Sequence, residues 1–217
     1  MRASHLLAAP SSAFSSCSWA CSAGRLRALA ARGYVVIAPN SQTGLLPSHS
    51  AFAKDLDAAI AWAQATQPNA NASKDAVLGH SMGGGAALLA AAADQSIDTV
   101  AVLAAAETNP SATTAARSVT VPALFVVGSS DTVVKPNTTR AMYDAKRSPA
   151  TWVSITGGYH CGFLDSSSFF GLGCYKGSIS RSTQVGLSND MLGDWLDATL
   201  KGGATFVRPA GTTGESK

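Results

Sequence analysis

Three residues in separate segments of this chain, Ser81, Asp131 and His160, are of the types that together perform nucleophilic catalysis. A serine hydroxyl is a weak nucleophile at neutral pH and needs a base within hydrogen-bond reach. A histidine can take the proton, and an aspartate can hold the imidazole tautomer and stabilise the imidazolium. Together these residue types predict acyl transfer through a covalent intermediate on Ser81.

The segment around Ser81 has the local sequence that a nucleophilic serine requires. GHSMGGG, from Gly79 to Gly85, contains the pattern G-x-S-x-G. The apolar run Asp75–Leu78 before it predicts a buried strand, and the helix formers Ala86–Ala93 after it predict a helix. In such a strand–turn–helix elbow the serine hydroxyl is exposed and the next backbone N–H faces the incoming carbonyl oxygen. We therefore expect Met82 to supply an oxyanion donor, which is worth on the order of 3 kcal/mol.

Two other interpretations compete for this segment. A chance G-x-S-x-G can occur in a chain rich in glycine and alanine. The uncharged run 76–93 could also be mistaken for a membrane helix, but each glycine costs roughly 1 kcal/mol in a helix interior. The nucleophile elbow is favoured because strand, turn and helix coincide and the partner residues follow along the chain.

Asp131 follows an apolar run, Val121–Val127, that is typical of a buried strand. A carboxylate in a short polar turn after such a strand is well placed to orient a histidine. The alternative is an aspartate that caps the helix expected from Pro136. If Asp131 does not orient the base, Asp165 is the next candidate.

His160 lies in a glycine-flanked loop, GGYHCGF, after the alternating pattern of Thr151–Thr156. The other histidines fit the role of base less well. His5 lies near the chain start, and His49 lies in a Ser-rich loop where a solvated side chain is expected. His80 lies inside the elbow, and its side chain should point away from the hydroxyl. His160 is therefore the predicted base.

The order serine, aspartate, histidine along the chain is that of the α/β-hydrolase fold and differs from two other well-known serine hydrolase folds. The elbow, the Val-Pro strand that leads to Asp131, and the GGYH segment resemble the cutinase and polyester-hydrolase branch of the α/β-hydrolases. They are also similar to its dienelactone-hydrolase-like and chlorophyllase-like relatives. The resemblance extends from about Arg25 to Leu200, including the passage Leu29–Asn40. It implies an esterase, because true dienelactone hydrolases use a cysteine where this chain has Ser81.

The resembling branch also has features that this chain does not show. Its polymer-degrading members commonly carry a stacking Trp shortly after the strand that follows the elbow helix. Here that region, Ala104–Pro110, contains no aromatic residue, which argues against polyesters but not against esters in general. Members of the fold also have a loop, often with His-Gly, that gives the second oxyanion N–H. We expect any such donor here within Ser15–Ala20.

The elements that must position these residues alternate between strands and helices, which predicts a mostly parallel, doubly wound sheet with helices on both faces. The predicted strands are Tyr34–Ala38, Ala76–Leu78, Thr99–Ala104, Ala123–Val127 and Trp152–Ile155. The predicted helices are Arg25–Ala31, Ala51–Ala65, the elbow helix, Pro136–Lys146 and Asn189–Leu200, the last with Ser188 as its N-cap.

We expect one α/β-hydrolase catalytic domain over residues 25–202, between two atypical ends. Residues 1–24 are rich in Ser and Ala, and no acidic residue appears before Asp55. The fold normally has further strands before the Tyr34 strand and none is evident, so we expect this N-terminal segment to be atypical or truncated. The sheet edge beside the Tyr34 strand would then expose apolar surface and favour self-association. Residues 203–217 are expected to form a flexible tail.

The four cysteines are Cys17, Cys21, Cys161 and Cys174. Relatives in the resembling branch often have a disulfide near the loop after the catalytic histidine, which implies a Cys161–Cys174 bridge. Two reduced thiols are the alternative, because the compartment is unknown. The apolar core after Arg2 is too short to identify a signal peptide. The location is therefore unknown, and a secreted and an organellar location both stay open. The Cys17–Cys21 spacing could serve a metal, but no second ligand pair accompanies it.

Composition agrees with a single globular domain, because 46% of the 217 residues are hydrophobic and can bury a sizeable core. The net charge of +3 is too small to imply a nucleic-acid partner. The sequence contains no dinucleotide fingerprint, metal-ligand cluster or membrane span. It therefore predicts cofactor-independent hydrolysis of small-molecule carboxylic esters through an acyl-enzyme intermediate. The alternative is a non-catalytic or poorly active hydrolase fold that lacks a complete oxyanion hole.

Overall fold

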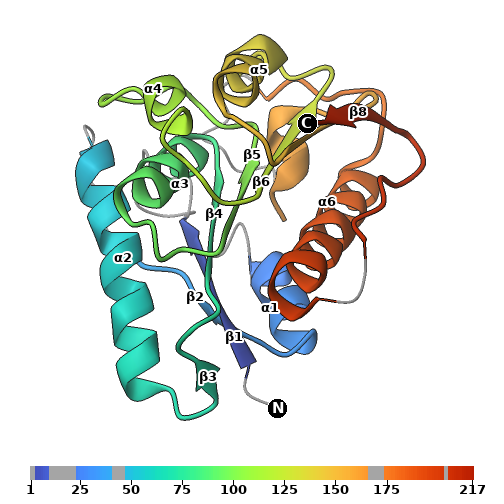
Figure 1. Cartoon of the computed structure of the whole chain (residues 1–217). Helices are drawn as coiled ribbons and strands as arrows, with labels where there is room; N and C mark the ends of the chain where they lie inside the picture. Colours follow the sequence, from blue (N-terminus) through green and yellow to red (C-terminus); the bar gives the residue numbers. More distant parts are fainter. Residues whose placement is uncertain (1–2, 10–22, 41–46, 166–173, 203–204) are drawn as a thin grey trace.

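The computed structural model describes residues 3–9, 23–40, 47–165, 174–202 and 205–217. In these residues strands and helices alternate along the chain, and the strands build one sheet that helices cover on both faces (Figure 1). The strands are β1 Ala3–Ala9, β2 Tyr34–Ile37, β3 Ala70–Asn71, β4 Ala76–His80, β5 Thr99–Leu103, β6 Ala123–Gly128, β7 Ala150–Ile155 and β8 Thr212–Ser216. The helices are α1 Ala23–Ala31, α2 His49–Thr66, α3 Met82–Ala93, α4 Ala112–Ala116, α5 Pro136–Ala145 and α6 Arg181–Leu196, with a 3₁₀ turn η2 at His160–Phe163 and a π-helical extension η3 at Asp197–Lys201.

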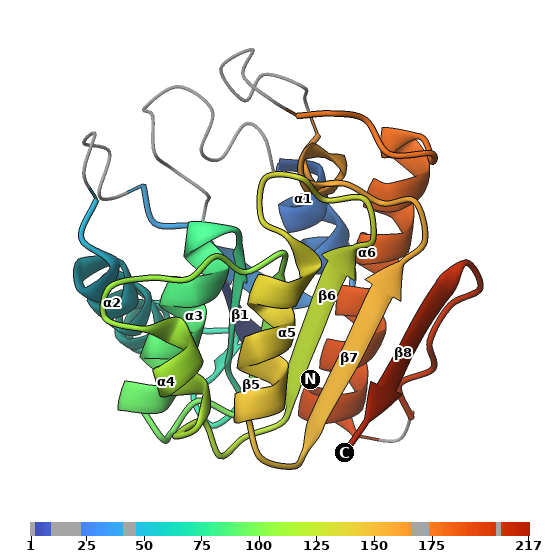
Figure 2. The same cartoon turned by 90° about the horizontal axis from the view of Figure 1, so that it is seen from above.

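The sheet has the order β2-β1-β4-β5-β6-β7-β8, and β3 pairs with β1. Neighbouring strands from β2 to β7 run parallel, and β8 pairs antiparallel with β7. Strands β4, β6 and β7 therefore end at the same edge of the sheet, as can be followed for β6 and β7 in Figure 2. The residues that follow these strand ends include Ser81, Asp131 and His160.

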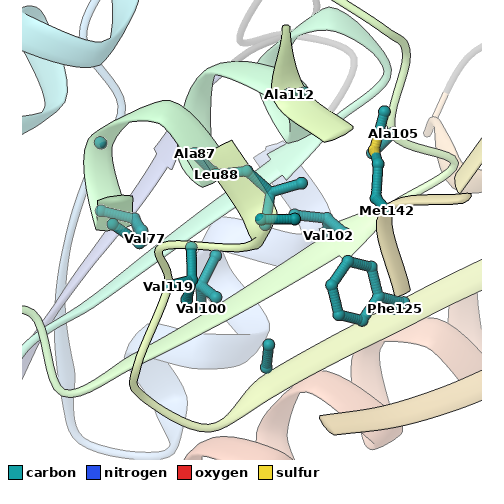
Figure 3. Close-up of a cluster of buried hydrophobic side chains, with 14 of the residues drawn as sticks. Val77, Ala87, Leu88, Val100, Val102, Ala105, Ala112, Val119, Phe125 and Met142 are labelled. Carbon is teal, nitrogen blue, oxygen red and sulfur yellow. The ribbon is translucent and has the colours of Figure 1, made fainter. Parts of the chain in front are cut away.

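Alternate residues of the strands pack against different helices. On one face Val77, Val102 and Phe125 meet Leu88 of α3 and Met142 of α5 in a continuous buried cluster (Figure 3). On the other face Leu78, Leu103, Val126 and Val153 pack against α1 and α6. Because both faces are covered, every residue of β4, β5 and β6 is buried, and these strands are mainly apolar, as parallel strands usually are. None of the helices in the described ranges combines the length and the apolar character that crossing a bilayer requires.

The expectation that residues 1–24 supply no strand is wrong for Ala3–Ala9. β1 forms there and runs between β2 and β4, pairing Leu7 with both Ile37 and Val77. Its sequence, ASHLLAA, contains no β-branched residue, but a strand with a neighbour on each side forms two hydrogen-bonded ladders. Within the described residues no strand pairs with the outer side of β2. Self-association through that edge stays a prediction.

The expectation of a flexible tail over residues 203–217 is wrong for β8. Thr212–Ser216 pairs with β7, and Lys217 exchanges backbone hydrogen bonds with Ala150 at 2.9 and 3.0 Å. Arg140 of α5 adds an ion pair from Nη2 to Oε1 of Glu215 at 2.7 Å. A strand at a sheet edge can be short and polar, and such a sequence lacks the apolar alternation from which a strand is predicted.

The last helix begins earlier than the sequence suggested. α6 starts at Arg181, and the hydroxyl of its N-cap Ser180 accepts the N–H of Thr183 at 3.0 Å. Ser188, the expected N-cap, is instead buried inside the helix. The first half of α6 is largely polar and contains Gly186, so it carries no apolar period that would have revealed a helix.

Candidate active site

Ser81 lies at the turn between β4 and α3 with φ 55° and ψ −124°. A positive φ is strained for a residue with a Cβ, so the surroundings must hold this turn. The N–H of Ser81 donates to the carbonyl of Leu103 on β5 at 3.0 Å, and the carbonyl of Ser81 accepts the N–H of Ala106 at 2.9 Å. The neighbouring strand and the loop after it therefore fix the turn through backbone hydrogen bonds.

Two glycines let the elbow close. A Cβ on Gly79 would overlap the carbonyl of Gly83, and a Cβ on Gly84 would lie 2.9 Å from the Cβ of Ala105. α3 includes Gly83, Gly84 and Gly85 and begins at Met82, before the predicted run Ala86–Ala93. Close packing of the first turn against β4 and β5 outweighs the helix-propensity cost, which is roughly 1 kcal/mol for each glycine.

Met82, the predicted oxyanion donor, is the first residue of α3. The first N–H groups of a helix have no acceptor inside the helix, and this end of the helix dipole favours negative charge. The N–H of Met82 therefore has the local setting that an oxyanion donor needs. The second donor, expected within Ser15–Ala20, lies outside the described residues.

Asp131 and His160 form a buried pair between the loops that follow β6 and β7. His160 Nδ1 lies 2.8 Å from Asp131 Oδ2, and the two side chains are 1% and 0% exposed. The other carboxylate oxygen, Oδ1, accepts the N–H groups of Val133 and Val134, each at 2.9 Å. These bonds fix the carboxylate, so Oδ2 is held toward the imidazole.

The loops that carry Asp131 and His160 are also joined through their backbones. The N–H of Ser130 donates to the carbonyl of Gly158 at 2.8 Å, and the N–H of Gly157 donates to Ser129 Oγ at 2.8 Å. A Cβ on Gly128 would lie 2.5 Å from the backbone nitrogen of Tyr159. Glycine at the end of β6 therefore permits the close approach on which the pair depends.

His80, the last residue of β4, packs against His160. The two ring centroids are 4.5 Å apart, and the ring centroid of Phe163 lies 5.7 Å from that of His80. Burial, together with repulsion from His160 and Arg25, lowers the pKa of His80 well below its usual range. His80 is therefore neutral near pH 7. Because His80 precedes Ser81, this contact also brings the elbow to the same part of the sheet edge as His160.

Asp165, the second candidate for orienting His160, is engaged elsewhere. Its Oδ2 accepts the N–H of Gly24 in the first turn of α1 at 2.6 Å, and the residue is exposed. The structure brings together Asp131 and His160, and places Asp165 at the N-terminal end of α1.

Cys161 and Cys174 are joined by a disulfide, with Cα atoms 5.8 Å apart. The bridge closes the chain segment that follows His160. Cys17 and Cys21 lie outside the described residues. In the ranges that are described, no group of three or more His, Cys, Asp or Glu side chains could hold a metal ion.

Sequence reasoning missed two residues that contact the His160 turn. Gln184 of α6 bonds to the backbone of Tyr159, and Arg25 of α1 bonds to the carbonyl of Phe163. A polar side chain on an apolar helix face is the signal that could have revealed Gln184. That signal was hidden because the first half of α6 was not predicted as helix.

The match to known protein families agrees with this geometry. The family described as PET hydrolase-like matches residues 9–177, a span that includes the elbow, Asp131, His160 and the disulfide. No curated protein matches the chain. The α/β-hydrolase fold expected from the sequence is confirmed. The chain belongs to the PET hydrolase-like family and is a hydrolase that acts on esters.

Proposed function

We propose that this chain is a serine esterase in which Ser81 attacks the ester carbonyl, His160 transfers the protons and Asp131 orients His160. The observation that carries the proposal is the buried pair of His160 and Asp131, 2.8 Å apart, at the sheet edge that also holds the strained turn of Ser81. Backbone strain of this kind concentrates at functional sites, where the surrounding structure maintains it.

In acylation, His160 takes the proton of the Ser81 hydroxyl as Oγ bonds to the carbonyl carbon. Negative charge then develops on the carbonyl oxygen, where the N–H of Met82 and the N-terminal end of α3 stabilise it. Asp131 stabilises the protonated imidazole, which gives its proton to the leaving alkoxide. The products of this half are an acyl ester on Ser81 and a free alcohol.

Deacylation repeats these steps with water as the nucleophile. His160 takes a proton from water as the water oxygen bonds to the acyl carbon. The tetrahedral intermediate collapses, the bond to Ser81 Oγ breaks, and His160 returns the proton to that oxygen. A carboxylic acid leaves, and the starting form of the enzyme is restored.

The substrates that fit best are carboxylic esters of small or medium size. Ala104 and Ala105 are fully buried beside the elbow, and the segment to Pro110 contains no aromatic side chain. Aromatic substrate rings gain binding energy from stacking on aromatic side chains. An aromatic polyester would find no such platform in this segment.

The test is hydrolysis of p-nitrophenyl acetate and butyrate by the purified chain, with Ser81→Ala as the variant. We expect Ser81→Ala to lower kcat by a factor on the order of 10⁵ without changing the circular dichroism spectrum, because the whole triad depends on its nucleophile. A fluorophosphonate probe should label Ser81 in the wild type. Ser96→Ala, at an exposed serine, is the control and should keep the full rate.

The outcomes separate the alternatives. Labelling at a serine other than Ser81, or full turnover by Ser81→Ala, would show that another nucleophile is used. A folded wild-type protein that neither turns over esters nor reacts with the probe would indicate the non-catalytic alternative.

A further inference from the structure

Gln184 of α6 binds the turn that carries His160. This glutamine is 0% exposed. Its Oε1 accepts the N–H of Tyr159 at 2.9 Å, and its Nε2 donates to the carbonyl of Tyr159 at 2.8 Å. One amide group thus binds both backbone polar groups of the residue immediately before His160. We call this pair of bonds the Gln184–Tyr159 clamp.

We propose that Gln184 is a positioning residue for His160. The clamp fixes the peptide before His160, so that the imidazole keeps its bond to Asp131 and stays positioned for the proton transfers proposed above. The inference rests on the proposed function, because it assigns Gln184 a part in the same reaction. Gln184 itself acts only through the backbone and does not contact the reacting atoms.

The chemistry of the clamp requires a side chain that carries a hydrogen-bond acceptor beside a donor. The side chains of Asn and Gln carry a carbonyl acceptor beside an NH₂ donor, which matches the acceptor and donor of a single residue's backbone. Tyr159 is 3% exposed, so water does not readily replace either bond. The carbonyl of Tyr159 also accepts the N–H of Gly162 at 3.1 Å. The clamp and the first bond of η2 therefore share one carbonyl oxygen.

The space around the clamp is filled. A Cβ on Gly162 would overlap Oε1 of Gln184, so the absence of a side chain at Gly162 makes room for the amide. Tyr159 packs with Cys161 and Leu164 in a small buried cluster. Because its surroundings are closely packed, the amide is confined to the orientation that makes both bonds.

A second side chain holds the other end of the same turn. Nη2 of Arg25 donates to the carbonyl of Phe163 at 2.7 Å and to Ser188 Oγ at 3.3 Å. Ser188 lies one helical turn after Gln184, so both anchors are fixed to the same helix. Burial lowers the pKa of Arg25 to about 10, which leaves its guanidinium charged near neutral pH. The turn is thus bound at its start by Gln184 and at its end by Arg25.

The experiment compares Gln184→Met, which keeps the length but removes both bonds, with Trp195→Phe as a matched control. Trp195→Phe removes a different buried hydrogen bond of α6, from Nε1 to Thr99 Oγ1 at 2.9 Å, at the other end of the helix. Displacing a catalytic group by about 1 Å can lower a rate by roughly 100-fold. We therefore expect Gln184→Met to lower kcat about 100-fold with KM within about twofold, whereas Trp195→Phe keeps kcat.

Gln184→Glu is the second variant and remains informative if Gln184→Met folds poorly. An ionised carboxylate accepts the N–H of Tyr159 but cannot donate to its carbonyl, and a protonated carboxyl can do both. The kcat of Gln184→Glu relative to the wild type should therefore rise as the pH is lowered. A side chain that only stabilises α6 would not produce this dependence.

A readout independent of turnover separates this inference from the proposed function. The downfield proton resonance of the His160–Asp131 hydrogen bond should shift or broaden in Gln184→Met and stay unchanged in Trp195→Phe. If the wild type neither turns over esters nor reacts with the probe, the proposed function is wrong, and this resonance still tests the clamp. If both variants lower the melting temperature equally but leave the resonance and kcat unchanged, Gln184 is a structural residue and the inference is overturned.

Discussion

Asp131 uses both oxygens of its carboxylate, and each oxygen has a different task. Oδ1 accepts two backbone N–H groups, and Oδ2 faces the imidazole of His160. All three partners are nitrogen atoms, so both oxygens of the carboxylate must act as hydrogen-bond acceptors. An asparagine offers one acceptor and one donor, and it must therefore place its NH₂ against a backbone N–H or against His160.

Asp131→Asn should lower kcat by a factor on the order of 10⁴, because the histidine is then held in the wrong tautomer. The fold should be little changed, and melting curves recorded beside p-nitrophenyl butyrate assays would measure both effects. Asp165→Asn is the matched control, since the amide oxygen can still accept the N–H of Gly24. A near wild-type rate for Asp131→Asn would show that another carboxylate orients His160.

Local sequence pattern predicts some residues of the candidate site but not others. Ser81, Asp131 and His160 each follow an apolar run and stand among turn residues, so their places at strand ends could be predicted from local pattern. The contact of His80 with His160 depends on how two strand ends face each other. The role of Gln184 depends on which face of α6 meets the turn. Neither of these relations is encoded in nearby residues.

At the scale of elements, burial explains which strands the sequence reveals. β4, β5, β6 and β7 are buried on both faces, and their apolar runs predicted them to within a few residues. The sequence does not reveal β1 and β8, for two different reasons. β1 consists largely of helix-forming residue types, and β8 is a polar edge strand with glycine in its centre. Each is fixed by pairing with a neighbour rather than by its own propensity.

Gly214 of β8 lies directly against the carbonyl of Trp152 on β7, and a Cβ there would overlap it. Gly214→Ala should therefore push β8 away from the sheet and lower the free energy of unfolding by about 1–3 kcal/mol. The esterase rate at 25 °C should stay unchanged, because the candidate site lies beyond the end of β7. Thr213→Ala, at the exposed neighbouring position, is the control. Equal melting temperatures for Gly214→Ala and the wild type would contradict this account of the edge.

At the scale of the whole molecule, ionisable groups lie at both ends of the parallel strands. The candidate site lies at the carboxyl ends of these strands. Asp75 lies at the opposite, amino end of β4. The backbone N–H of Asp75 donates to Asp98 Oδ2 at 2.9 Å. Asp75 is 3% exposed and its Oδ1 has no hydrogen-bond partner among the described residues. Burial first, and then repulsion from Asp98, raise the pKa of Asp75 to about 6.

This raised pKa makes stability depend on pH with a definite sign. The folded chain keeps a proton on Asp75 up to about pH 6, whereas the unfolded chain loses it near pH 4. Burial of the Asp75 charge therefore does not lower the free energy of unfolding below about pH 4. The loss of free energy grows from about pH 4 to about pH 6 and then stays constant. Asp75→Asn should raise the free energy of unfolding by on the order of 2 kcal/mol at pH 8 and by little at pH 4.

Urea unfolding at a series of pH values measures this difference between the variant and the wild type. Asp190→Asn, at an exposed position, is the control and should show no such trend. A gain for Asp75→Asn that is equal at pH 4 and pH 8 would mean that packing, rather than charge, accounts for it.

The orientation of α3 has a consequence for the end of the reaction. Ester cleavage releases an alcohol, which is neutral, and a carboxylic acid, which ionises near neutral pH. The N-terminus of α3 lies beside Ser81, and this end of a helix favours negative charge. The acid should therefore be retained more strongly than an alcohol of the same chain length. We expect the acid product to inhibit the enzyme more strongly than the alcohol product. The helix end that we propose as the stabiliser of the oxyanion should therefore also delay departure of the acid.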